Sequence, residues 1–285
     1  MDRRRTAFNG RVAAAHLEGQ VDAERFVDGK PQTIAVTIAD MLDKPEGRRD
    51  RQLVRGETFV ALDVVDGWVY GYAERDGYAG WIDGSDFVHA TSDLLTHKVS
   101  AAQTYGKSSP GLKEMGRVTP LSFGVRLAVM EDAEGWARVS WTRGAIPQDL
   151  YVPSGHLAAV DYTENDPIDV AERLLGTPYL WGGNSSFGTD CSGLVQMACL
   201  ACGIPCPGDA DMQEKELGVP LPEDVALQRG DLLFWKGHVA WLADADTLIH
   251  ANAYHMATAY EPLDAALTRI EAQGDGPVTT RKRLE

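Results

Sequence analysis

A cysteine in the C-terminal half of the chain has the local sequence of a nucleophile. Cys191 follows Asp190 in residues 177–202, which read TPYLWGGNSSFGTDCSGLVQMACLAC. Asp190 is a good helix N-cap because its carboxylate can accept a backbone N–H of the first turn, so we expect Cys191 at the first helical position. The positive end of the helix macrodipole lowers the pKa of a cysteine placed there and favours the thiolate. This stretch alone leaves open a buried, unreactive thiol.

Two histidines on predicted strands complete a possible catalytic set. His238 follows a tight Lys236-Gly237 turn in RGDLLFWKGHVA, and His250 lies in TLIHA. A cysteine at a helix start followed by two strand histidines suits a thiol nucleophile, a general base and an orienting group. In this scheme His238 takes the thiol proton, and His250 accepts the hydrogen of the other ring nitrogen of His238. Because a histidine stands in the third place, we expect no buried negative charge to support the imidazolium.

The order of PYLWGG, DCSGLVQ, GDLLFW, GHVA and IHA across residues 165–285 resembles that of the NlpC/P60 cysteine peptidases. This resemblance implies a papain-like α+β domain that cleaves peptidoglycan stem peptides between γ-D-glutamate and a diamino acid. It also implies that the Tyr179 hydroxyl helps to hold the oxyanion, together with the backbone N–H of the cysteine. By the same resemblance Asp190 and Ser192 bind the free amino group of the substrate's first residue. Trp181 is a further candidate for contact with the substrate.

The residues before this domain suggest two small β-barrels. Gly-Trp and Asp-Gly patterns at residues 67–82 predict a hairpin, and a second such pattern follows at residues 135–153. We therefore expect an N-terminal extension at residues 1–35 and barrels at residues 36–92 and 93–160. The extension has helical character between Val12 and Phe26, and the residues from Arg143 to Gln148 are expected to interrupt the second hairpin.

The GW…DGYAGWI pattern of the first barrel resembles bacterial SH3-like domains. In multi-domain relatives a tyrosine of the first SH3-like domain closes the substrate cleft. Tyr78 matches that turn best, and Tyr72 is the alternative.

The four cysteines lie in one short segment, which is not the pattern of a disulfide framework and suggests a reducing compartment. Cys199 and Cys202 fall on the expected core face of the helix, where free cysteine behaves as a small hydrophobic residue. With Cys206 they make three ligands, whereas a structural zinc normally takes four. We therefore predict neither a metal nor a cofactor.

The chain carries a net charge of −15, which argues against nucleic acid and against an anionic membrane surface as partners. The basic N-terminus is not followed by the apolar core of a secretory signal, and no run of about 18 apolar residues predicts a membrane span. We expect a cytoplasmic protein, with an exported precursor trimmed of its signal as the alternative. The composition indicates no oligomeric state.

The expected substrate is a recycled murein peptide with a free N-terminal L-alanine, because the resemblance includes the order SH3-like, SH3-like, peptidase. A secreted wall hydrolase whose barrels bind murein is the first alternative, and an inactive binding protein is the second. A metallohydrolase that uses Asp231, His238 and His250 is weaker, because Asp231 stands in a Gly-Asp turn before a strand.

Overall fold

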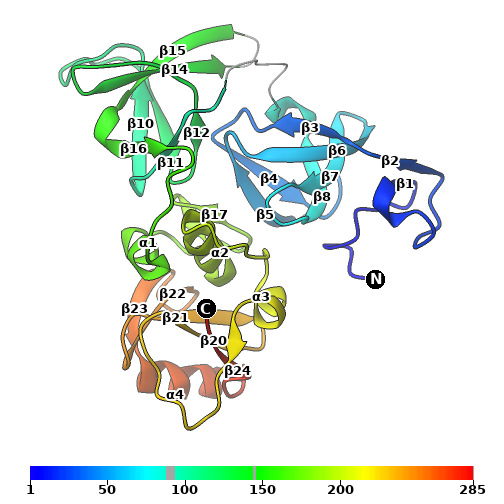
Figure 1. Cartoon of the computed structure of the whole chain (residues 1–285), viewed down its shortest axis with the longest axis vertical. Helices are drawn as coiled ribbons and strands as arrows, with labels where there is room; N and C mark the ends of the chain where they lie inside the picture. Colours follow the sequence, from blue (N-terminus) through cyan, green and yellow to red (C-terminus); the bar gives the residue numbers. More distant parts are fainter. Residues whose placement is uncertain (88–93, 144–145, 285) are drawn as a thin grey trace. The chain divides into compact units, whose positions relative to one another are not determined.

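The computed structural model describes residues 1–87, 94–143 and 146–284 of the chain (Figure 1). It divides into two compact units, Met1–Tyr162 and Thr163–Glu285. The division falls at the start of the polar residues 162–166. The second unit carries Cys191, His238 and His250, so it is described first.

The second unit is built on one antiparallel sheet with the strand order β19-β24-β20-β21-β22-β23. Its strands are β19 (Val219–Pro220), β20 (Asp231–Trp235), β21 (His238–Leu242), β22 (Thr247–Asn252), β23 (Ala257–Pro262) and β24 (Thr280–Arg283). The helices are α1 (Pro167–Arg173), α2 (Cys191–Ala201), α3 (Ala210–Glu216) and α4 (Leu263–Gln273), and a small hairpin joins β17 (Asn184–Ser185) to β18 (Gly188–Thr189).

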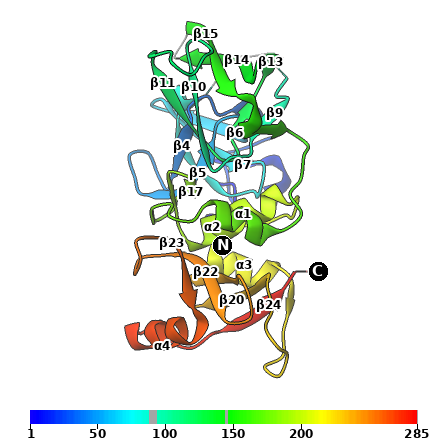
Figure 2. The same ribbon diagram turned by 90° about the vertical axis from the view of Figure 1, so that its left-hand side faces the viewer.

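Helices cover both faces of this sheet, because its central strands are apolar on both sides. Helices α1, α2 and α3 lie on one side and α4 lies on the other (Figures 1 and 2). Alternate residues of β20, Leu233 and Trp235, pack with Ala266 and Ile270 of α4. Since side chains alternate between the faces of a strand, Leu232 and Phe234 point to the opposite face. Helix α2 packs on β21 and β22, the two strands that carry the histidines.

The first unit holds two small β-structures, as the Gly-Trp patterns predicted. The first is a six-stranded sheet formed by β3 (Lys30–Thr33), β4 (Ile38–Leu42), β5 (Arg49–Val54), β6 (Thr58–Val65), β7 (Trp68–Ala73) and β8 (Ala79–Asp83). The second combines a five-stranded and a three-stranded sheet from β9 (His97–Val99), β10 (Gln103–Lys107), β11 (Val118–Ser122), β12 (Arg126–Leu127), β13 (Val129–Ala133), β14 (Trp136–Arg143), β15 (Ile146–Pro153) and β16 (Leu157–Ala159). Short 3-10 turns occur at Ala15–Leu17, Gly84–Asp86 and Ser154–His156.

The two β-structures pack against each other within this unit. The Arg55 guanidinium lies 3.8 Å from the ring centroid of Trp141, and Val54 joins the apolar core of the second structure. Burial lowers the pKa of Arg55 to about 10, which still leaves it charged at neutral pH. The predicted junction at residues 92 and 93 lies outside the described residues.

Two expectations for the first unit are wrong. Over the described residues the second hairpin shows no interruption, because β14 and β15 stay paired from Trp136↔Pro153 to Arg143↔Ile146. Residues 144 and 145 lie outside the described residues. The N-terminal extension is also not helical between Val12 and Phe26. It forms the parallel pair β1 (Val12–Ala14) and β2 (Arg25–Val27), and the first β-structure already begins at Lys30. Apolar residues with helical spacing pack here as strands because the sheet of the first β-structure offers them an apolar surface.

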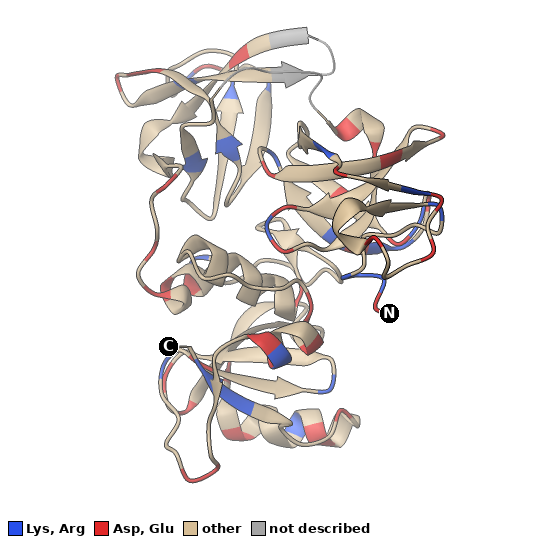
Figure 3. Ribbon diagram, turned by 45° about the vertical axis from the view of Figure 1, so that its right-hand side comes forward, with Lys and Arg blue, Asp and Glu red and all other residues tan. Residues whose placement is uncertain are grey.

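Acidic and basic residues are interspersed along the elements of both units (Figure 3). Acidic residues predominate in number, 42 against 27. Among the described residues, no helix has the length and apolar character needed to cross a membrane.

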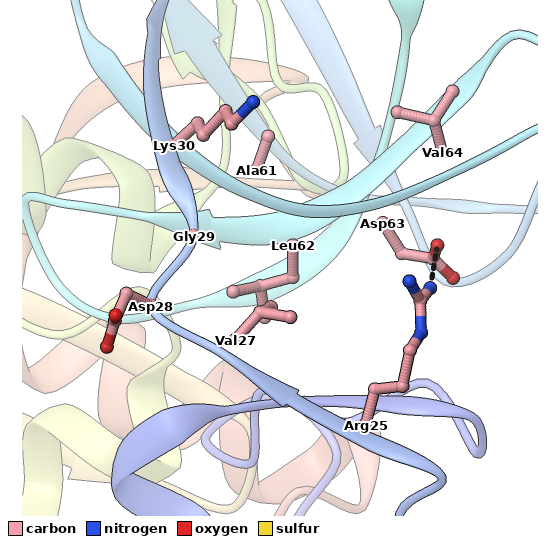
Figure 4. A pocket seen from close by; sticks show the side chains of 9 residues that line it. All are labelled: Arg25, Val27, Asp28, Gly29, Lys30, Ala61, Leu62, Asp63 and Val64. Atoms are coloured by element: carbon pink, nitrogen blue, oxygen red, sulfur yellow. Dashed lines mark hydrogen bonds and ion pairs between the residues drawn. The ribbon is translucent and has the colours of Figure 1, made fainter.

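One buried carboxylate, Asp63 on β6, ties the N-terminal extension to the first β-structure. Asn9 donates to it at 2.9 Å and Arg11 at 2.7 Å, and Arg25 lies 3.4 Å away. Burial alone would raise the pKa of Asp63, but the hydrogen bonds from Arg11 and Asn9 outweigh it and lower the pKa. A pocket of about 410 Å³ opens beside the Arg25–Asp63 pair, between the extension and β6 (Figure 4).

We predict that Asp63→Asn loosens the extension, because the neutral amide cannot hold two arginines by charge. The variant should lose its first 27 residues faster in limited proteolysis and melt at a lower temperature than wild type. Asp22→Asn, an exposed acid-to-amide change in the same extension, is the matched control. Equal proteolysis of the two variants would contradict this role.

Candidate active site

Helix α2 begins at Cys191 because Asp190 caps it. Asp190 has extended backbone angles, φ −99° and ψ −178°, and its Oδ1 accepts from the Gly193 N–H at 2.7 Å. The same oxygen accepts from the Ser192 hydroxyl at 3.0 Å, and Oδ2 accepts from the Gly182 N–H at 2.8 Å. One carboxylate therefore joins the Gly-rich loop to the first turn of the helix.

Buried amides fix this helix against its neighbours. The Gln213 side chain of α3 donates to the Ser192 carbonyl at 2.9 Å. Gln196 accepts from the Asn184 amide at 2.9 Å and donates to the Cys206 carbonyl at 3.0 Å. Both glutamines are fully buried. The position of Cys191 thus depends on several polar contacts besides its helix cap.

Tyr179 lies in the electrostatic neighbourhood of Cys191. Burial raises the pKa of its hydroxyl, and the nearby Cys191 and Asp190 raise it further. The hydroxyl therefore stays protonated at neutral pH and can donate a hydrogen bond. This is the property that the predicted oxyanion role requires.

The two histidines are in direct contact. His238 Nε2 and His250 Nδ1 are 2.9 Å apart, and the ring centroids are 5.1 Å apart. His250 is fully buried, whereas His238 is half-buried. Burial is the main cause that lowers the pKa of each ring, so both are neutral near pH 7. His238 Nδ1 is then the ring nitrogen left for proton transfer.

A buried carboxylate supports the second histidine, which corrects our expectation that no negative charge lies behind the pair. Glu261 Oε2 lies 3.0 Å from His250 Nε2 and 2.7 Å from Arg269 Nη2. Burial would raise the pKa of Glu261, but its hydrogen bonds with Arg269 and His250 lower it to about 2. The signal was present in the sequence as an acidic residue in the apolar strand ATAYEP. Recognising it would have required the register of β22 and β23.

A pocket of about 630 Å³ adjoins His238. It is lined by Tyr179, Trp181, Lys236, Gly237, His238, Asn252, Ala253, Tyr254, Arg269, Ile270, Gln273 and Asp275. Trp181 is 70% exposed, so its indole is available to a ligand. The pocket therefore brings two predicted site residues, Tyr179 and Trp181, together with the predicted base.

Tyr78 and Tyr72 belong to the first unit. The Tyr78 side chain is buried and its backbone N–H bonds the Asp76 carboxylate at 3.0 Å, whereas Tyr72 packs on the N-terminal extension. The predicted role of either tyrosine in closing the cleft stays a prediction.

Asp231, the carboxylate that the metallohydrolase hypothesis used as a ligand, is paired with an arginine. It is fully buried and accepts from Arg283 at 2.7 Å and 2.8 Å. Within the described ranges, His250, His255 and Glu261 do bring ligand atoms within 4.8 Å of one another. A cation there would have to displace Arg269 from Glu261, so we propose no metal at this place.

A helix that starts at a capped cysteine, a neutral histidine pair and a tyrosine donor together define the class of a cysteine hydrolase on an α+β fold. The comparisons with known proteins agree with this class. The sequence profile of the NlpC/P60 family matches residues 176–268, and that of the bacterial dipeptidyl-peptidase SH3 domain matches residues 41–87.

Curated relatives extend the similarity. A γ-D-glutamyl-L-lysine dipeptidyl-peptidase of Bacillus cereus is 34% identical over 251 residues, which cover 75% of this chain and 71% of the relative. The enzyme of the same name from Bacillus subtilis is 34% identical over 138 residues, 46% of this chain and 43% of the relative. Dipeptidyl-peptidase 6 of Lysinibacillus sphaericus is 35% identical, again over only 41% of each chain. This chain thus spans less than half the length of two of these three relatives.

A crystal structure of an NlpC/P60 family protein from Bacillus cereus has the same fold. Its TM-score is 0.73 at 20% identity, over 89% of this chain and 99% of that one. This chain belongs to the NlpC/P60 family of cysteine peptidases, and its first unit contains an SH3-like domain.

We predict that Cys191→Ala abolishes turnover and leaves the fold intact. Cys199→Ala, at a fully buried position of the same helix, should keep activity and lose about 1 kcal/mol of stability. Burial raises the pKa of the Cys202 thiol to about 11, so that cysteine cannot substitute as a nucleophile. Activity and melting temperature of both variants decide the matter, and an active Cys191→Ala would reject the assignment.

We also predict that His238→Ala lowers kcat by about 10²- to 10⁴-fold, because the general base is lost. His250→Asn should keep part of the activity, since an amide oxygen can still accept from the His238 ring. The rate of Cys191 alkylation by iodoacetamide should fall in the first variant, with exposed His16→Ala as control. Loss of wild-type activity in EDTA, restored by zinc, would instead favour the metal hypothesis.

Proposed function

We propose that this protein is a cysteine endopeptidase that cleaves the bond between γ-D-glutamate and a diamino acid in peptidoglycan stem peptides. The observation that carries the proposal is the 2.9 Å contact between His238 and His250. His238 also lines a pocket with Tyr179, whose hydroxyl lies in the electrostatic neighbourhood of Cys191. The names of the Bacillus relatives support the same bond class.

Acylation uses three groups of this site. The Cys191 Sγ forms a bond to the carbonyl carbon of γ-D-glutamate, and the thiol proton passes to His238 Nδ1. The Tyr179 hydroxyl and the Cys191 backbone N–H stabilise the oxyanion. When the tetrahedral intermediate collapses, the C–N bond breaks and His238 returns the proton to the leaving amine of the diamino acid.

Deacylation uses the same base. His238 takes a proton from water as the water oxygen attacks the thioester carbonyl. The C–S bond then breaks, and the proton on His238 returns to the thiolate. Both half-reactions need His238 to begin neutral, with its lone pair on Nδ1. The burial that lowers the pKa of His238 meets this need near neutral pH.

We infer that the peptide has a free N-terminal L-alanine. Asp190 is a carboxylate with little solvent exposure beside the nucleophile, so it is the group that can pair with an ammonium there. Ser192 holds that carboxylate in place through its hydroxyl. A charge-assisted hydrogen bond of this kind contributes about 1.5–3 kcal/mol.

We infer further that the substrate is a released peptide, turned over in the cytoplasm. The −15 net charge supports this because it disfavours attraction to an anionic wall polymer. A wall hydrolase whose SH3-like units bind murein is the alternative enzyme. An inactive binding protein is less favoured, since the cysteine, both histidines and the supporting carboxylate are all in place.

We predict that wild type cleaves L-Ala-γ-D-Glu-diaminopimelate at least tenfold more efficiently than the N-acetylated peptide. Asp190→Asn should shrink this ratio by about 10- to 100-fold, the equivalent of the charge-assisted bond. Asparagine is also a good N-cap, so the helix should persist. The lost contact with the Gly182 N–H should lower kcat/KM for both peptides alike, which is why the ratio is the readout. The assay is kcat/KM by mass spectrometry, with melting temperature recorded for each variant.

Asp166→Asn is the matched control, because Asp166 caps α1 in the same unit through the Ile168 N–H. It should leave the ratio unchanged. Equal cleavage of free and acetylated peptides by wild type would reject the free-amine requirement. Firm co-sedimentation with insoluble murein would favour the wall hydrolase.

A further inference from the structure

The His238–His250 pair ends at a buried ion pair that belongs to two other elements. Glu261 is on β23 and Arg269 is on α4. Arg269 donates a hydrogen bond to each carboxylate oxygen of Glu261, with Nε 2.8 Å from Oε1 and Nη2 2.7 Å from Oε2. Glu261 is 5% exposed. It therefore faces His250 as a fixed group and cannot swing into solvent.

The hydrogen-bond roles along this chain are set from its far end. An ionised carboxylate can only accept, so His250 must carry its hydrogen on Nε2. His250 Nδ1 is then a lone pair, and it must accept from the Nε2–H of His238. A neutral His238 with its hydrogen on Nε2 has its lone pair on Nδ1. Each step follows from the previous one because a neutral imidazole has one donor and one acceptor.

We propose that Glu261 and Arg269 are positioning residues for the peptidase reaction, which together keep His238 in the tautomer that can take the thiol proton. This inference rests on the proposed function. It assigns no contact with the substrate to either residue. Arg269 keeps Glu261 ionised, so that its carboxylate accepts a hydrogen bond from His250.

Arg269 is needed because protonation of Glu261 would reverse these hydrogen-bond roles. A protonated Glu261 could donate to His250 Nε2, which would move the His250 hydrogen to Nδ1. That hydrogen would face His238 Nε2, so His238 would carry its own hydrogen on Nδ1 and could not act as base. The bidentate contact with Arg269 opposes this, in agreement with the lowered pKa of Glu261.

Arg269 is itself held in place. Its guanidinium lies 4.7 Å from the ring centroid of Tyr254, and Nη1 donates to Gln273 at 2.8 Å. The charged or titratable groups around the chain of hydrogen bonds are His238 on β21, His250 on β22, Glu261 on β23, Arg269 on α4, His255 and Tyr254 in the turn before β23, and Asp275 after α4. Arg269 lowers the pKa of His238 and Glu261 raises it, so the two charges oppose each other at the base.

The first arm of the test is kinetic and uses Glu261→Leu, Glu261→Gln and Arg269→Met in the full chain. Glu261→Leu should lower kcat about 10- to 100-fold, which is the usual loss of activity when a supporting hydrogen bond is removed. KM should stay within about twofold of the wild-type value. Glu261→Gln should recover much of this loss, because its amide oxygen still accepts from His250. In Arg269→Met the acid limb of the kcat profile should move to higher pH. Glu271→Gln, an exposed change on α4, is the matched control.

The second arm needs no substrate. In the Cys191→Ala background, ¹⁵N NMR of the histidine rings should show His250 as the Nε2–H tautomer, and Glu261→Leu should give a mixture. In Arg269→Met the hydrogen of His250 should move from Nε2 to Nδ1 as the pH falls. A change in His238 basicity alone would leave His250 as Nε2–H, so the two causes are separable.

The two arms also separate this inference from the proposed function. If wild type cleaves none of the peptides but the tautomers behave as stated, the substrate is wrong and the positioning role stands. A folded Glu261→Leu with wild-type kcat, or an unchanged His250 tautomer, overturns the inference. If Glu261→Leu does not fold, Glu261→Gln and Arg269→Met decide by their tautomers and pH profiles.

Discussion

The carboxylate of Asp190 holds two backbone segments together, and the position of the nucleophile depends on it. It accepts from the Gly182 N–H in the loop and from the Gly193 N–H in the helix. The loop and the helix can approach this closely because Gly193 carries no side chain, since a Cβ there would overlap the Gly183 carbonyl oxygen. Gly183 is needed within the loop itself, where its Cβ would lie 2.5 Å from the Gly188 carbonyl oxygen. The PYLWGG and DCSG motifs are thus two halves of one contact.

The register of the sheet determines which carboxylate lies next to the catalytic histidines. His250 pairs with Ala259, and Leu248 pairs with Glu261, so Glu261 is the diagonal neighbour of His250 on the same face. A slip of one residue would turn Glu261 to the opposite face. The hairpin of β22 and β23 therefore controls the ionic surroundings of the histidines. Helix α4 then brings Arg269 to the same carboxylate.

The sequence predicted those parts of the site that local rules determine. The cap at Asp190 and the helix start at Cys191 depend on a few adjacent residues, and the Lys236-Gly237 turn pairs Trp235 with His238. Glu261 was missed because its role depends on pairing between two strands. The helical expectation for the N-terminal extension failed for a related reason. Its apolar residues meet a neighbouring sheet, and tertiary packing outweighs local propensity.

The ion pair behind the histidines makes this site different from a triad with a lone carboxylate. A lone buried carboxylate would stabilise the imidazolium by charge. Here Arg269 is bound to the carboxylate, and it lowers the pKa of His238 while Glu261 raises it, so the two charges oppose each other at the base. Hydrogen bonds keep their direction even when the net charge is small. The contribution of Glu261 and Arg269 is therefore the placement of protons, and the basicity of His238 depends mainly on its burial.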